Sequence, residues 1–409
     1  MKTVAVLGTF DTKGKELKFI KECIEEHGLK TLCINTGVFE PVVEPDISSA
    51  EVAAAVGADI NAIVEKRDRA TATEVLAKGT EKLIPQLYAE GKFDGIISIG
   101  GSGGTSLATP AMRQLPLGVP KVMVSTMASG DVSPYVGTSD IVMIPSVVDA
   151  EGLNDISKVI FSNAANAIVG MVQNRKEIES DGNPLLAATM FGVTTPCVKA
   201  AEDYLHEQGY DVLVFHATGT GGKCMEALID QGFIKGVLDL TTTEWCDEVV
   251  GGVLNAGPDR LTAAGKNGIP QVVSVGALDM VNFGPMDTVP AQFKDRNLYK
   301  HNPTVTLMRT TADELKSIGH EIATRLADAT GKTTLMLPLK GVSMIDVEGQ
   351  PFYDAEADKV LFDTLRTELA DSNVEIVELD TDINDKEFAV AAAKKLISLL
   401  QEESEKSDL

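Results

Sequence analysis

Residues 95–105 read Gly95-Ile96-Ile97-Ser98-Ile99-Gly100-Gly101-Ser102-Gly103-Gly104-Thr105, and this run is the clearest indication of the architecture. Its first half is a short apolar segment of the kind that forms a buried strand. Its second half is a glycine-rich turn, after which residues 105–114 predict a helix in spite of Pro110. A buried strand, a polar loop and a helix in this order are the repeating unit of a parallel α/β sheet.

The same unit occurs on both sides of this run. Residues 4–7 and 31–35 predict strands, and an amphipathic helix that Gly28 closes lies between them. Further strands are predicted at 119–125 and 141–144, and a long helix at 154–174. The polar segment 175–184, which contains Asp-Gly-Asn-Pro, predicts a linker. We therefore expect an N-terminal Rossmann-like, nucleotide-binding domain over residues 1–180.

After the linker the pattern begins again. Strands are predicted at 187–191 and 210–215, and segments 232–240 and 268–274 echo segments 91–99 and 118–124. Later strands are predicted at 304–308, 334–338 and 375–379, with helices between and after them. The fold class is therefore α/β, with two Rossmann-like, doubly wound parallel-sheet domains, the second over residues 186–409. Duplication of one domain would explain why these segments recur in the same order. The alternative is coincidence, because all doubly wound domains share similar turn residues between their strands and helices.

Composition narrows the functional classes. The chain of 409 residues has 60 acidic and 36 basic side chains, a net charge of −24, which disfavours nucleic acid and anionic membranes as partners. Its five cysteines are widely spaced and form no CxxC pair, which argues against a disulfide framework or a structural zinc site. No stretch has the pattern of a secretory signal or the length of a membrane span, so we expect a cytoplasmic protein.

Three loops of the first domain are candidates for binding, because open parallel sheets bind ligands beyond the carboxyl ends of their strands. In the glycine-rich turn at 100–105, backbone amides and the N-terminus of the following helix could bind a phosphate. The Gly-Lys-Ser/Thr ending of a P-loop and the GxGxxG spacing are both absent. Lys13 could neutralise phosphate, while Asp11 and Asp131 could hold magnesium or ribose. The predicted cofactor-binding residues are Gly8, Thr9, Asp11, Thr12, Lys13, Gly100, Gly101, Ser102, Gly103, Gly104, Thr105, Ala128, Ser129, Gly130 and Asp131.

Each loop also has a purely structural interpretation. The glycine run could be a turn that permits close packing, and Asp11 or Thr12 could be no more than a helix N-cap. The loop that contains Ala128, Ser129 and Gly130 could be a turn of small residues.

The second domain carries its own set of polar strand-end residues. His216 lies in a second glycine-rich loop, 216–222, and Glu244 and Asp247 share a face if their segment is helical. With Arg309, these side chains would suit acid–base chemistry on a small anionic metabolite in the cleft between the domains. The alternative for His216 is a buried, hydrogen-bonded histidine.

Five long motifs, at residues 7–14, 98–105, 127–132, 215–222 and 276–284, resemble the ATP-binding family typified by the N-terminal region of the tomato mosaic virus resistance protein. The resemblance covers essentially the whole chain. It implies two Rossmann-like domains, a homodimer, and ATP with Mg²⁺ at the first domain. Because the plant relative continues into a barrel-like domain, it also implies a separately encoded barrel protein as partner.

The leading hypothesis is an ATP-binding protein of unknown reaction that holds the nucleotide in its three first-domain loops. One alternative is an enzyme that acts on a small anionic metabolite through His216, Glu244, Asp247 and Arg309. Another is an interaction module whose nucleotide state controls docking to the barrel-type partner.

Overall fold

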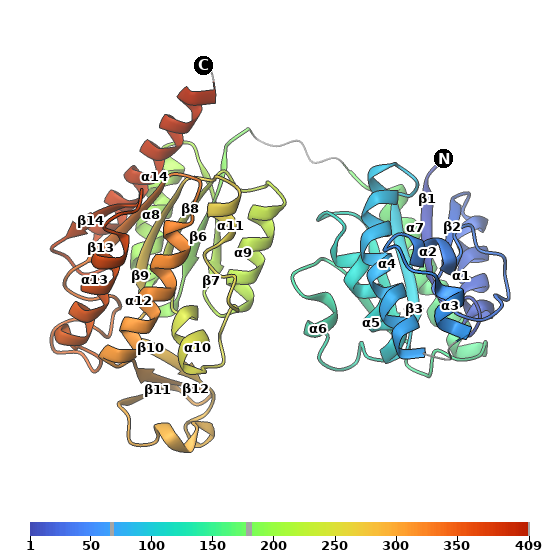
Figure 1. Cartoon of the computed structure of the whole chain (residues 1–409), viewed down its shortest axis with the longest axis horizontal. Helices are drawn as coiled ribbons and strands as arrows, with labels where there is room; N and C mark the ends of the chain where they lie inside the picture. Colours follow the sequence, from blue (N-terminus) through green and yellow to red (C-terminus); the bar gives the residue numbers. More distant parts are fainter. Residues whose placement is uncertain (66–68, 177–181, 408–409) are drawn as a thin grey trace. The chain divides into compact units, whose positions relative to one another are not determined.

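The computed structural model describes residues 1–65, 69–176 and 182–407, and the chain divides into one compact unit over Met1–Glu179 and another over Ser180–Leu409 (Figure 1). Both units are α/β and each contains a parallel sheet, so the predicted fold class is confirmed. Of the predicted linker at 175–184, residues 177–181 lie outside the described residues. In the described part of the chain, no helix is both long enough and apolar enough to span a membrane.

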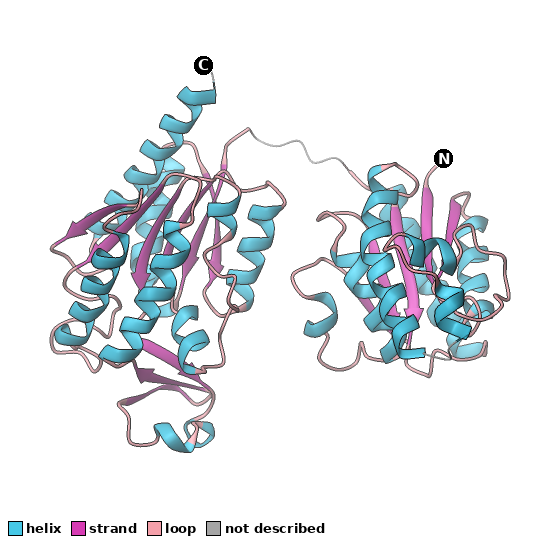
Figure 2. Cartoon of the chain, in the orientation of Figure 1, coloured by secondary structure: helices cyan, strands magenta, loops and turns pink. Residues whose placement is uncertain are grey.

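The first unit is a five-stranded parallel sheet with helices on both faces (Figures 1 and 2). Alternate residues of a strand face opposite sides: Val4 and Val6 pack on one face with α1 and α7, whereas Ala5 and Leu7 pack on the other with α4 and α5. The strands are β1 (Thr3–Gly8), β2 (Lys30–Asn35), β3 (Gly95–Gly100), β4 (Lys121–Ser125) and β5 (Val142–Pro145), in the order β2-β1-β3-β4-β5. The helices are α1 (Gly14–Glu26), α2 (Ser49–Ala54), α3 (Ile60–Glu65), α4 (Arg69–Ala89), α5 (Ser102–Arg113), α6 (Ser133–Val136) and α7 (Asp155–Gln173).

The second unit is built around a six-stranded parallel sheet. Its strands are β6 (Leu185–Met190), β7 (Asp211–His216), β8 (Gly236–Thr241), β9 (Gln271–Gly276), β13 (Thr333–Pro338) and β14 (Glu375–Leu379), in the order β14-β13-β9-β8-β6-β7. In both units the first strand lies between the second and the third, and the fourth strand follows the third. This shared order is the one that duplication predicts.

Helices cover both faces of this sheet as well. Helices α8 and α14 share one hydrophobic cluster, while α12 and α13 belong to another. The helices are α8 (Thr195–Glu207), α9 (Thr220–Asp230), α10 (Glu244–Val250), α11 (Ala263–Lys266), α12 (Ala312–Ala327), α13 (Ala355–Leu369) and α14 (Lys386–Ser407), with short 3₁₀ turns at Gly192–Thr194, Met286–Thr288 and Ala291–Phe293.

A small antiparallel sheet was not predicted. It consists of β10 (Met280–Phe283), β11 (Leu298–Asn302) and β12 (Val305–Arg309), in the order β10-β12-β11 (Figure 2). The sequence predicted only a strand at 304–308, because runs this short carry no sign of which sheet they join. Arg309 therefore ends an antiparallel strand and not a strand of the main sheet.

Two helices begin earlier than predicted. Helix α5 starts at Ser102 and not at 105, and α9 starts at Thr220 inside the predicted loop 216–222. Glycine disfavours helix interiors, which led to the late predictions, but a first turn tolerates glycine because its amides have no intrahelical acceptors. The predicted glycine loops are therefore largely first turns of helices.

Candidate functional site

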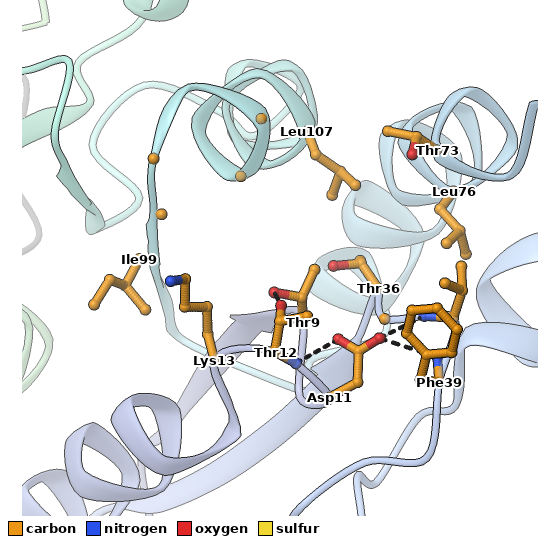
Figure 3. A pocket seen from close by; sticks show the side chains of 16 residues that line it. Thr9, Asp11, Thr12, Lys13, Thr36, Phe39, Thr73, Leu76, Ile99 and Leu107 are labelled. Atoms are coloured by element: carbon orange, nitrogen blue, oxygen red, sulfur yellow. Dashed lines mark hydrogen bonds between the residues drawn. The ribbon is translucent and has the colours of Figure 1, made fainter. Parts of the chain in front are cut away.

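The first unit contains a cavity of about 240 Å³ at the carboxyl ends of β1, β2 and β3 (Figure 3). Because β1 lies between β2 and β3, this is the point where the strand order reverses, the usual ligand site of a doubly wound sheet. The lining residues are Thr9, Asp11, Thr12, Lys13, Thr36, Gly37, Val38, Phe39, Thr73, Leu76, Ile99, Gly100, Gly101, Gly103, Gly104 and Leu107. Two of the three predicted loops thus meet at one cavity.

The glycine run forms the start of α5 with Gly101 as N-cap. The Thr105 amide donates to the Gly101 carbonyl (2.9 Å), whereas the amides of the turn before it lie where an α-helix supplies no acceptor. Close packing explains Gly100, because a Cβ there would lie 2.8 Å from the Gly104 Cα, whereas a Cβ on Gly103 would meet nothing within 4 Å. The turn therefore presents accessible amides, and the helix dipole favours an anion there.

The two hydroxyls predicted in this run do not line the cavity. Ser102 is exposed, and Thr105 is fully buried, where its hydroxyl donates to the Gly101 carbonyl (2.7 Å) and lies 2.6 Å from the Ser125 hydroxyl. Thr105 thus fastens the turn after β3 to the end of β4.

The loop after β1 supplies the cavity with a cation. Lys13 is the N-cap of α1, its side chain is 18 % exposed, and its Nζ lies 3.9 Å from Oε2 of Glu151. In Figure 3 its ammonium group points toward the chain of the glycine turn. The Thr12 hydroxyl donates to the Thr9 hydroxyl (2.9 Å), so the N-cap role considered for Thr12 and Asp11 is not observed.

Gly8 has a packing role at the end of β1. A Cβ there would lie 2.8 Å from Cδ1 of Leu17. The residue therefore lets α1 approach the strand and does not itself line the cavity.

Asp11 holds the neighbouring loop. Its Oδ1 accepts the Thr12 amide (2.6 Å), and its Oδ2 accepts the amides of Val38 and Phe39 (both 3.0 Å). A Cβ on Gly37 would lie 2.4 Å from the Asp11 carboxyl carbon, so glycine is needed where the two loops meet. The Asp11 carboxylate therefore fixes the segment after β2 at the rim of the cavity (Figure 3).

This segment after β2 is the part of the site that sequence reasoning missed. Thr36 is 3 % exposed, and within the described structure its hydroxyl has no hydrogen-bond partner, although it lines the cavity. Asn35 positions the segment, because its Oδ1 accepts the amides of Phe10 (3.1 Å) and Gly37 (2.8 Å). The signal that could have found it is its place directly after a predicted strand.

The third predicted loop does not line the cavity. Ser129, Gly130 and Asp131 are exposed and Ala128 is half-buried. The Asp131 carboxylate accepts the Ser133 amide (3.0 Å) at the start of α6, and this hydrogen bonding lowers its pKa. Of the two predicted metal ligands, only Asp11 lines the cavity, and the described residues contain no group of three or more His, Cys, Asp or Glu side chains that could hold a metal ion.

In the second unit a glycine turn follows β7, the second strand of its sheet, and a side chain of the protein fills it. Oε1 of Glu244 accepts the amides of Gly219 (2.8 Å) and Gly222 (3.1 Å) at the start of α9. Nε of Arg260 donates to the other oxygen of this carboxylate (2.5 Å), and the Arg260 guanidinium also binds both oxygens of Asp239 (2.5 and 2.7 Å). Glu244 and Asp239 are 1 % exposed and Arg260 is 2 % exposed. Glu244 therefore satisfies the amides at the start of α9 within the protein itself.

The other predicted catalytic residues have separate partners. Asp247 shares the first turn of α10 with Glu244, as predicted for a helical segment, and accepts the amides of Asn282 (2.8 Å) and Leu254 (2.7 Å); burial raises its pKa to about 7. Arg309 donates to Asp358 (2.6 Å) and Asp346 (3.2 Å). His216 is exposed at the end of the edge strand β7. Arg309 lines a different cavity, of about 490 Å³.

These features define the class of protein: a two-unit, Rossmann-like α/β protein with a cavity at the switch point of its first sheet. The chain belongs to the Uncharacterised protein family UPF0261, whose N-terminal domain matches residues 2–177 and whose C-terminal domain matches residues 183–400.

Relatives match along nearly the whole chain. A UPF0261 protein of Clostridium tetani is 57 % identical and covers 98 % of this chain and 99 % of its own length. The ToMV resistance protein Tm-1(GCR237) of Solanum lycopersicum is 41 % identical over 97 % of this chain, which corresponds to 55 % of the plant protein. A putative UDP-N-acetylglucosamine 2-epimerase from Listeria monocytogenes matches 99 % of this chain and 98 % of its own. Its sequence identity is 10 % and the TM-score is 0.24, so this match carries no argument about function.

Proposed function

We propose that this protein binds a nucleotide, ATP in the first instance, in the cavity of the first unit. The observation that carries the proposal is the bipolar lining of that cavity. One end has the ammonium of Lys13 and the start of α5, the other has the side chains of Phe39 and Leu76, and Leu107 lies between them (Figure 3). A ligand that fits both ends has an anionic part and a flat apolar part, which is the chemistry of a nucleotide.

The phosphates would lie against the glycine turn. Amides near Gly103 and Gly104 would donate to phosphate oxygens, and Lys13 would neutralise charge, as in other helix N-terminal phosphate sites. The Thr36 hydroxyl, buried without a partner in the described structure, would gain one from the ligand.

Mg²⁺ would enter with the phosphates. Magnesium typically uses one or two protein carboxylates together with substrate phosphates and waters. Of the residues described at the cavity wall, Asp11 is the one carboxylate, so it would be the protein group nearest to the metal. Asp131 does not line the cavity and takes no part in this proposal.

The chain would bind one nucleotide and not two. In the second unit the anion position at Gly219 and Gly222 is already taken by Glu244, and a Cβ on Gly222 would lie 2.5 Å from the oxygens of that carboxylate. The glycine turn of the second unit would therefore not hold a second phosphate group.

Calorimetric titration with MgATP tests the proposal. We expect the unaltered protein to bind one ATP per chain and Gly103→Asp to weaken binding at least tenfold, because the new carboxylate projects into the phosphate end. Gly170→Asp is the matched control, since Gly170 lies in α7 and, like Gly103, has nothing within 4 Å of an added Cβ. The absence of ATP binding by the unaltered, folded protein would overturn the proposal.

A further inference from the structure

Phe39 is an aromatic side chain left open to solvent at the wall of the cavity. It is 60 % exposed, whereas the apolar side chains of Leu76 and Leu107 in the same wall are 1 % and 7 % exposed. In Figure 3 the ring stands at the opposite end of the cavity from Lys13. Covering an apolar ring with a ligand removes the ring from water, which is favourable and stabilises the complex.

The backbone that carries this ring is held in place. The Phe39 and Val38 amides both donate to Oδ2 of Asp11 (3.0 Å each), and the Gly37 amide donates to Oδ1 of Asn35 (2.8 Å). A ring on a fixed backbone loses less conformational freedom when it contacts a ligand. The exposed position of Phe39 is thus maintained by the fold.

The side chains around the Phe39 ring favour contact with the flat face of a ligand ring over hydrogen bonds to its edge. The cavity lining also contains the apolar side chains of Val38, Leu76 and Leu107 and the hydroxyl residue Thr73. The charged lining residues are Lys13, at the other end, and Asp11, whose oxygens accept backbone amides. Every nucleobase has a π-face, so an aromatic side chain can stack on different bases. Distinguishing one base from another needs hydrogen-bond donors and acceptors that match the base edge.

We propose that Phe39 stacks on the base of the bound nucleotide, so that this site selects nucleotides over inorganic polyphosphate but discriminates weakly between adenine and guanine. The inference rests on the proposed nucleotide function and adds to it the residue that recognises the base. Stacking of a base on an aromatic side chain contributes an amount that corresponds to roughly a tenfold to hundredfold change in affinity.

The experiment compares three ligands, MgATP, MgGTP and magnesium tripolyphosphate, by calorimetry with the full chain. The variants are Phe39→Ala, which removes the ring, and Phe39→Trp, which keeps an aromatic face. Phe233→Ala is the matched control, because Phe233 is also exposed (43 %) but lies in the second unit and does not line the cavity. Circular dichroism confirms that each variant is folded.

We expect Phe39→Ala to weaken ATP and GTP binding by roughly tenfold to hundredfold and to leave tripolyphosphate binding unchanged. Phe39→Trp and Phe233→Ala should bind all three ligands like the unaltered protein, and GTP should bind within about tenfold of ATP. If the unaltered protein binds ATP but Phe39→Ala binds it equally well, the stacking inference is wrong and the nucleotide proposal stands. If the unaltered protein binds no nucleotide, both fail.

Discussion

Oε2 of Glu244 lies 2.5 Å from Nε of Arg260 in a buried ion pair, while the other oxygen of Glu244 accepts two amides from the start of α9. The carboxylate of Glu244 thus supplies the negative charge at the start of α9. Asp239 is a second carboxylate partner of Arg260; burial opposes the charge of the guanidinium, but the acidic neighbours outweigh it and raise the pKa of Arg260. The glycine turn after β7 is therefore already occupied, whereas the glycine turn after β3 lines an open cavity.

Removing the Glu244 carboxylate should destabilise the second unit. Glu244→Ala leaves Nε of Arg260 and the buried Gly219 and Gly222 amides without an acceptor, so we expect the free energy of unfolding to fall by about 3 kcal/mol. Unfolding in urea followed by fluorescence measures this, because the single tryptophan, Trp245, lies next to Glu244 in α10.

The matched control for this change is Glu368→Ala, since Glu368 pairs with His320 on the surface. An exposed pair contributes at most about 1 kcal/mol. Formate or acetate should restore part of the stability of Glu244→Ala and none of that of Glu368→Ala. Equal stability of the two variants would contradict the role given to Glu244.

The ammonium of Lys13 should contribute to binding of the phosphates and not of the base. Lys13→Met should weaken both MgATP and magnesium tripolyphosphate roughly tenfold to hundredfold, the range for a hydrogen bond to a charged group. Lys18→Met is the control, because Lys18 lies on α1 but pairs with Glu22 on the surface. A loss confined to ATP would place Lys13 away from the phosphates. Binding by the unaltered protein should also weaken as ionic strength rises.

Replacement of Asp11 separates two roles of its carboxylate. If Asp11 mainly fixes the Val38 and Phe39 amides, Asp11→Ala should reduce ATP affinity at any magnesium concentration and change tripolyphosphate binding less. If it is mainly a metal ligand, the loss should depend on magnesium and affect both ligands. Titrations with and without Mg²⁺ distinguish the two, and we expect the first result because three amides already occupy the carboxylate.

The second unit should lose stability as the pH rises from about 4 to about 7. Burial raises the pKa of Asp247 from 3.8 to about 7, so over this range the folded state holds a proton that the unfolded state has released. Each pH unit then costs up to about 1.4 kcal/mol through this group. Asp247→Asn should flatten the dependence of the Trp245-monitored unfolding free energy on pH. A variant with the same slope as the unaltered protein would show that Asp247 does not titrate in this way.

Most of the fold could be predicted from the sequence because its signals are local. The apolar run before Gly100, the polar loop after Gly8 and the repeated turns depend on neighbours in the chain, as do the strand and helix preferences they express. The small sheet of β10, β11 and β12 was missed because its pairing joins residues as far apart as Met280 and Arg309, and strands so short carry no partner information.

For the candidate site, too, local sequence signals determined one part and the packed fold determined the rest. The sequence by itself determined that Lys13 and the glycine turn lie at strand ends, and therefore on one edge of a parallel sheet. Only the tertiary structure decided which strand ends meet: the order β2-β1-β3 brings Thr36 and Phe39 to that cavity and leaves Asp131 outside it. It also decided that Glu244 fills the second glycine turn, because its partners Gly219 and Arg260 are distant in the chain. Strand order and long-range charge pairing are properties of the packed fold, and no local pattern of residues encodes them.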